Sequence, residues 1–129
     1  AFFIVCFVGL SLGNFWVYPK KISQGWDSTL AHLPYYKLRN EMIDFIEKEE
    51  IPFKKIGSAF PNLLSVKFID LKNSEKHFEE KDLSRQEYIF YSNIFNDFSD
   101  EEIDDLEQNW KVVKELRNIN VCVILYRRN

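Results

Sequence analysis

Residues 110–127 read WKVVKELRNINVCVILYR and predict the strands on which the fold depends. The segment 121–126 is apolar throughout and rich in β-branched residues, which is typical of a strand buried on both faces. The two asparagines of the RNIN stretch tolerate the backbone conformations of tight turns. We therefore expect a hairpin formed by residues 110–116 and 121–127.

A helix with a clear start signal precedes this hairpin. Ser99 is followed three residues later by Glu102, which is the sequence pattern of a capping box. Acidic residues in the first turn suit the helix dipole, so we expect a helix over residues 100–108. One alternative stays open, a single long helix followed by a parallel last strand. It rests on apolar residues that continue at helical spacing: Ile103, Leu106, Trp110 and Val113.

Upstream segments complete the expected domain. Residues 34–50 predict an amphipathic helix, because opposite charges stand four apart and one stripe is apolar. That stripe consists of Tyr35, Leu38, Met42, Phe45 and Ile46. Residues 88–92 (YIFYS) predict a central strand, and 55–60 and 63–71 predict weaker ones. The charged segment 72–86 predicts an exposed loop with one helical turn.

The first nineteen residues, AFFIVCFVGLSLGNFWVYP, carry no charge. As a helix they would span roughly 28 Å, close to the bilayer core of about 30 Å. Trp16, Tyr18, Lys20 and Lys21 follow the apolar run, and aromatic rings followed by cations are typical of a membrane interface. We therefore expect the end of a transmembrane helix and its interfacial exit over residues 1–19.

Two other interpretations of this leader stay open. A signal peptide would explain the apolar run and its small residues, although the usual basic start is missing. A buried core segment would also be apolar. With the transmembrane interpretation, the chain divides into the leader and a soluble α/β domain over residues 20–129. The expected fold class is α+β: a small mixed sheet with an amphipathic helix packed on it.

The composition of the chain excludes several kinds of partner and ligand. The net charge is −3 and the sequence contains no basic stripe, so nucleic acid is not an expected partner. Cys6 and Cys122 lack metal-ligand spacing and are expected to be small buried hydrophobic residues. The acidic cluster at the start of the 100–108 helix does not match a calcium loop. We expect no metal and no cofactor.

One short segment offers weak ligand candidates. Trp26, Asp27 and His32 lie close together in sequence. A structural role is favoured for each: Trp26 seats the domain near the membrane, Asp27 caps a helical turn and His32 is hydrogen-bonded. A free-standing hydrolase would need a nucleophile with a base, and Asp27 with His32 is the nearest approach to one. No catalytic residue is predicted.

The order of features resembles a known family. An apolar helix is followed by NFWVYPKKISQGWDSTLAHLPYYKLRNEM (14–42), then by YIFYSN (88–93) and a terminal VCVILYRR (121–128). This layout resembles the C-terminal tail of bacterial multi-pass membrane glycosyltransferases of the protein O-mannosyltransferase and aminoarabinose-transferase type. Such enzymes transfer a sugar from a polyprenyl-phosphate carrier, and their catalytic acidic residues lie near the N-terminal membrane helices.

The resemblance implies a non-catalytic extracytoplasmic domain of an inner-membrane transferase, facing the periplasm or the outside. It would contact the bilayer through residues 1–19 and the rest of the parent chain, and would shape the acceptor entrance or pack over the active site. No catalytic residue is carried over, because the matching segments contain none. The alternative is a membrane-anchored or exported binding module without enzymatic activity.

Overall fold

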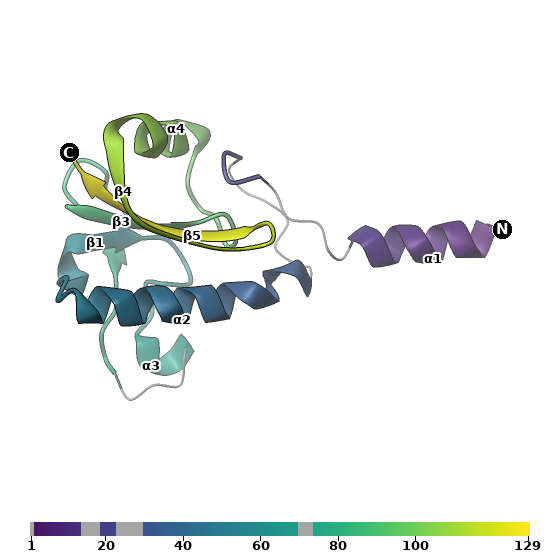
Figure 1. Cartoon of the computed structure of the whole chain (residues 1–129), viewed down its shortest axis with the longest axis horizontal. Helices are drawn as coiled ribbons and strands as arrows, with labels where there is room; N and C mark the ends of the chain where they lie inside the picture. Colours follow the sequence, from purple (N-terminus) through teal and green to yellow (C-terminus); the bar gives the residue numbers. More distant parts are fainter. Residues whose placement is uncertain (1, 14–18, 23–29, 70–73) are drawn as a thin grey trace.

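The structure consists of an apolar helix and a separate α+β domain (Figure 1). It is a computed structural model that describes residues 2–13, 19–22, 30–69 and 74–129. Helix α1 spans Phe2–Gly13 and projects away from the domain. The elements of the domain are, in chain order, the 3₁₀ helix η1 (Leu30–His32), α2 (Leu33–Lys48), the 3₁₀ helix η2 (Phe53–Lys55), β1 (Ile56–Ser58), α3 (Val66–Ile69), β2 (Glu79–Glu80), β3 (Tyr88–Ser92), α4 (Asp100–Asn109), β4 (Trp110–Asn118) and β5 (Val121–Arg128).

The domain is built on a mixed five-stranded sheet in the order β2-β1-β3-β5-β4. The strand β1 pairs in parallel with β2 and β3, whereas β5 pairs antiparallel with β3 and β4. The predicted hairpin and the predicted central strand over 88–92 are therefore confirmed. The alternative of one long helix before a parallel last strand is wrong, because α4 ends at Asn109 and β4 begins at the next residue.

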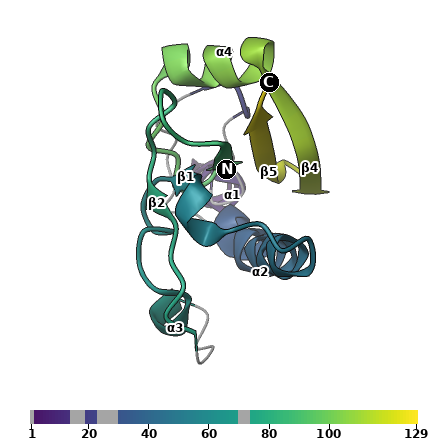
Figure 2. The same cartoon turned by 90° about the vertical axis from the view of Figure 1, so that its left-hand side faces the viewer.

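Helices cover both faces of the sheet, with α2 on one side and α4 on the other (Figure 2). Alternate residues of β5 pack on opposite faces of the sheet, one face towards α2 and the other towards α4. Val121, Val123 and Leu125 pack in the cluster that contains α2. Cys122, Ile124 and Tyr126 pack with Ile103 and Leu106 of α4. The burial of both faces explains why this strand is apolar at every position from Val121 to Tyr126 rather than at every second one.

Helix α2 confirms the predicted amphipathic helix, with three differences on its buried face. Ile43 is buried, whereas Phe45 is only half-buried against the cluster. Arg39 is also fully buried, with 0% of its surface exposed. A charged residue in the core is unusual, and its partners are described with the site below.

Helix α4 begins at the predicted capping box. The Ser99 hydroxyl accepts a hydrogen bond from the Glu102 backbone N–H at 3.2 Å, and the Glu102 carboxylate accepts one from the Ser99 N–H at 2.8 Å. Glu102 also forms an ion pair with Lys81, which precedes the turn leading to β3. The cap therefore joins the start of α4 to the segment that follows β2, the edge strand opposite β4.

Ser99→Ala is expected to lower the free energy of unfolding by about 1 kcal/mol, because the first turn of α4 loses a hydrogen-bond acceptor. Chemical denaturation measures the change. Ser99→Asp is the control, since aspartate accepts the same hydrogen bond and should cost less. Equal losses in the two variants would show that the cap is not the cause.

Three local predictions are wrong. Residues 66–69 of the expected strand 63–71 form the short helix α3. The segment 72–86 was expected to be an exposed loop, but its described part contains β2 and the buried Phe78, which stacks on Phe53 and Phe90. Cys6 is exposed on α1, although Cys122 is buried as expected.

Helix α1 contributes no buried side chain to the protein. The interpretation of the leader as a core segment is therefore wrong for the residues that α1 contains. Among the described residues, none of the helices has the length and apolar character required to cross a bilayer. The α+β class expected for the domain is confirmed, with α2 packed on a mixed sheet.

Candidate functional site

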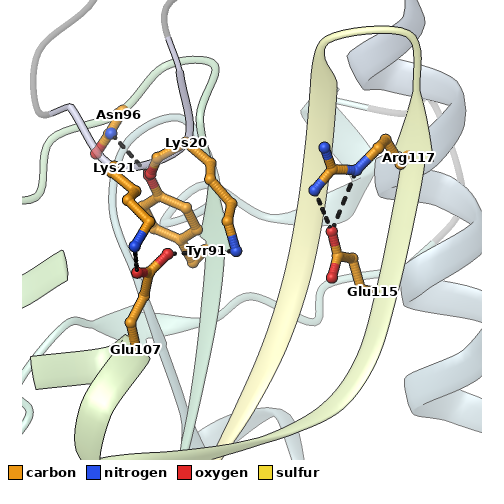
Figure 3. Close-up of polar contacts among 7 residues, drawn as sticks. All are labelled: Lys20, Lys21, Tyr91, Asn96, Glu107, Glu115 and Arg117. Atoms are coloured by element: carbon orange, nitrogen blue, oxygen red, sulfur yellow. Dashed lines mark hydrogen bonds and ion pairs between the residues drawn. The ribbon is translucent and has the colours of Figure 1, made fainter. Parts of the chain in front are cut away.

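The segment Pro19–Ile22, which begins at the last residue of the apolar leader, is bound to the domain. A turn is closed by the Ile22 N–H, which donates to the Pro19 carbonyl at 3.1 Å. Glu107 of α4 lies between the two lysines of this turn (Figure 3). Its carboxylate oxygens are 3.2 Å from Lys20 Nζ and 2.5 Å from Lys21 Nζ. One acidic side chain therefore joins the predicted membrane exit to the helix that covers the sheet.

Tyr91 of β3 holds the backbone of the same turn. Its hydroxyl donates to the Lys20 carbonyl and accepts from Asn96 Nδ2 at 3.1 Å (Figure 3). The same Asn96 amide lies 3.2 Å from the Ile22 carbonyl. Burial raises the pKa of Tyr91 above its usual value, so the hydroxyl keeps the proton that it donates. We call Pro19–Ile22, Tyr91, Asn96 and Glu107 the junction site.

The ion pairs of the junction site shift two pKa values. The hydrogen bond from Lys21, aided by Lys20, lowers the pKa of Glu107, and Glu107 raises the pKa of Lys21. A lowered carboxyl pKa gives stability that is present above the unfolded value of about 4.3 and is lost as pH falls through the folded value. A raised lysine pKa gives stability that is lost only above about pH 10.4. The junction should therefore hold throughout the neutral range.

Lys21→Met is expected to raise the pKa of Glu107 towards its ordinary value, because it removes the strongest hydrogen bond to this carboxylate. Carbon-detected NMR titration of the carboxyl group measures the shift. Lys20→Met should raise the same pKa by a smaller amount, since Lys20 is the weaker partner. An unchanged Glu107 pKa in Lys21→Met would contradict the contact.

The loop of residues 93–96 connects the junction site to two other segments. The Asn93 side chain accepts a hydrogen bond from the Cys122 N–H at 2.9 Å and donates to the Asn120 carbonyl at 2.7 Å, so it binds the turn between β4 and β5. Phe95 has a left-handed backbone (φ 51°), and its ring lies 5.3 Å from that of Tyr35 on α2. This loop, called loop 93–96 below, therefore contacts the start of α2, the hairpin turn and the junction site.

His32, a weak ligand candidate, lies beside this loop in η1. Its ring centre is 5.9 Å from that of Phe95 and 6.1 Å from that of Tyr36. The Nδ1 atom is buried and accepts or donates no hydrogen bond within the described residues. Ring packing against Phe95 and Tyr36 holds the side chain, and the expected structural role of His32 stays a prediction.

A buried polar chain lies on the α2 side of the sheet. Asn62 Oδ1 accepts hydrogen bonds from Arg39 Nε at 2.6 Å and from the Tyr35 hydroxyl at 3.0 Å. Asn62 Nδ2 donates to Ser58 Oγ at 3.2 Å, and that hydroxyl donates to the Phe90 carbonyl at 3.0 Å. These polar groups bind one another and the backbone of β3. This series of buried hydrogen bonds therefore stabilises the fold.

The other predicted site residues are distributed as follows. Lys20 and Lys21 lie in the junction site, where their partner Glu107 was not foreseen. Trp16, Tyr18, Trp26 and Asp27 lie outside the described residues. Sequence spacing cannot identify Tyr91, Asn96 or Glu107 as partners of residues 19–22, because about seventy or more positions separate them. The only hint was their type, since buried tyrosine and asparagine side chains seek hydrogen-bond partners.

Comparisons with protein-family models, with curated proteins and with solved structures found no match to this chain.

Proposed function

We propose that α1 is the membrane-embedded end of a transmembrane helix and that residues 20–129 form a non-catalytic domain at the outer surface of a cell's inner membrane. In this proposal the chain is the C-terminal extracytoplasmic part of a multi-pass glycosyltransferase that uses a polyprenyl-phosphate-linked sugar. The domain shapes the acceptor entrance or packs over the active site of the parent enzyme.

The exposure of α1 is the observation that carries the proposal. All twelve residues of α1 lack charge, and none of them is buried against the domain. Its exposed side chains include large apolar ones, namely Phe2, Phe3, Ile4, Val5, Phe7, Val8, Leu10 and Leu12. A continuous apolar surface of this kind is costly in water and favourable in lipid. The twelve residues rise about 18 Å, which is part of the hydrocarbon thickness of about 30 Å.

The junction site keeps the domain close to this helix in the chain, because Pro19 follows Gly13 by only six residues. The residues that follow the leader are held by two ion pairs and by hydrogen bonds to Tyr91 and Asn96. A domain that is bound to the segment linking it to α1 keeps a defined end towards the membrane. This suits a domain that acts on access to a membrane-embedded active site.

Determining the reading frame upstream of residue 1 tests the transferase part of the proposal. We expect a long series of apolar segments with acidic residues in the loops near the N-terminus. We also expect no sugar transfer by the present chain when it is assayed alone with a polyprenyl-phosphate-linked sugar. A start codon directly before residue 1 would contradict the transferase assignment and favour an anchored or exported binding module. Sugar transfer by the chain alone would contradict its non-catalytic role.

A further inference from the structure

Exposed apolar side chains gather on the segments that meet at loop 93–96. Asn93 binds the β4–β5 turn, Phe95 packs against His32 and Tyr36, and Asn96 binds the Ile22 carbonyl. These segments expose five large apolar residues: Ile22, Leu30, Leu33, Tyr36 and Ile119. We call these five residues the apolar end. Single exposed apolar residues are normal, but several on contacting segments mark an interaction surface.

Ile119 is the most informative member of the apolar end. It occupies the turn between β4 and β5 with 84% of its surface exposed and a left-handed backbone (φ 52°). A β-branched residue in this conformation is strained, and glycine or asparagine would be the ordinary choice. In water, the exposed isoleucine side chain gains nothing that offsets this strain. Contact with an apolar environment would give the side chain a free-energy gain that offsets the strain.

Ionic groups close to the apolar end have partners within the domain, and the two lysines that share the Glu107 carboxylate keep a net charge of +1. Lys20 and Lys21 pair with Glu107, and Arg117 Nη2 lies 2.6 Å from Glu115 Oε1 on β4 (Figure 3). An internally paired charge costs less to bring near a low-dielectric surface than an isolated one. This arrangement lowers the cost of approaching an apolar surface and does not depend on anionic lipid.

Covalent geometry keeps the apolar end near α1. Six steps along the chain separate Gly13 from Pro19, so they lie at most about 22 Å apart. Pro19 begins the turn that Asn96 holds at Ile22. In Figure 1, the start of α2 and the β4–β5 turn also lie at the end of the domain towards α1, whereas the C-terminus lies at the opposite end.

We propose that the apolar end rests on the surface of the lipid bilayer that α1 enters, with Ile119 and Leu33 inserted at the boundary between headgroups and acyl chains. Tyr36, with an apolar ring and a polar hydroxyl, suits the headgroup level. This inference rests on the proposed insertion of α1. It specifies which end of the domain contacts the lipid. The opposite end of the sheet then points away from the membrane.

Spin-label accessibility on the full chain in phosphatidylcholine vesicles tests the inference. Ile119→Cys and Leu33→Cys are each introduced together with Cys6→Ser, while Cys122 is buried and stays unlabelled. Asn129→Cys, at the opposite end, is the matched control. Circular dichroism checks that each variant is folded, and flotation checks that it is bound to the vesicles.

The accessibility of each spin label is measured with oxygen, which concentrates in lipid, and with a neutral nickel chelate, which stays in water. The two reagents distinguish three results. We expect oxygen to exceed nickel accessibility at positions 119 and 33, and the reverse at 129. High nickel accessibility at 119 and 33 in a chain that floats would overturn the docking while leaving the insertion of α1 intact. Low accessibility to both reagents would mean that protein, such as a second copy, covers the apolar end, which also overturns the inference. A chain that does not float would overturn the inference together with its premise.

Discussion

Phe90→Ala is expected to lower the free energy of unfolding by about 3–5 kcal/mol, the usual cost of removing a buried phenylalanine ring. Phe90 lies on the central strand β3 with 0% of its surface exposed, and it pairs with Leu125 across the sheet. Its ring stacks on Phe78 at 5.0 Å, and Phe78 stacks on Phe53 at 5.1 Å. The substitution therefore opens a cavity in the middle of the α2-side core. Urea denaturation followed by circular dichroism measures the loss.

Phe68→Ala is the matched control for this prediction. Phe68 lies on α3 with 69% of its surface exposed, so the same deletion should change the free energy of unfolding by no more than about 0.5 kcal/mol. The stability of a small domain totals only about 5–15 kcal/mol, so the difference between the two variants should be large. Similar losses in both would contradict the placement of Phe90 in the core.

Asn62→Leu is expected to lower the free energy of unfolding by about 3 kcal/mol although it preserves side-chain size. The amide oxygen of Asn62 accepts hydrogen bonds from the buried Arg39 guanidinium and the Tyr35 hydroxyl, and its NH₂ group binds Ser58. Leucine would leave a buried cation without this neighbouring acceptor, and burial makes that loss expensive. Thermal and urea denaturation both measure the change.

Tyr35→Phe serves as the control, because it removes one hydrogen bond from the same amide and leaves the Arg39 contact in place. Its expected cost is about 1 kcal/mol, the usual net contribution of a neutral hydrogen bond. If Asn62→Leu proved as mild as Tyr35→Phe, the Arg39–Asn62 contact would not contribute to stability as described.

The features that the sequence predicted are those encoded by local patterns. The Ser99–Glu102 cap depends on residues three apart, and the helical face of α2 follows from its 3.6-residue period. The all-apolar run of β5 correctly indicated burial on both faces, because a strand with one wet face alternates. The hairpin followed from turn residues placed between two strand-like segments.

The features that the sequence missed depend on contacts between distant segments. Arg39 lies on the buried face of α2 because Asn62, twenty-three positions later, supplies an acceptor there. Residues 66–69 have β-prone side chains but form α3, away from the sheet. Local propensity is overridden in such cases by tertiary context.

The junction site shows the same limit in the candidate functional region. Lys20 and Lys21 were predicted as interfacial cations from the apolar run before them, and that prediction concerns the membrane alone. Their pairing with Glu107 depends on how α4 packs over the sheet, which no local pattern specifies. Whether the two lysines also lie at a bilayer interface stays a prediction.

Vesicle flotation of the full chain tests the central claim that α1 enters a lipid bilayer. The wild-type chain with phosphatidylcholine vesicles should move to the top of a density gradient. Phe3→Asp combined with Phe7→Asp should remain at the bottom, because each charge in an apolar helix costs about 2.5–3.5 kcal/mol to place in the bilayer. Phe68→Asp, which changes an exposed phenylalanine of the domain, should float like the wild type. A wild-type chain that stays in the aqueous fraction, or a doubly substituted chain that floats equally well, would contradict the account.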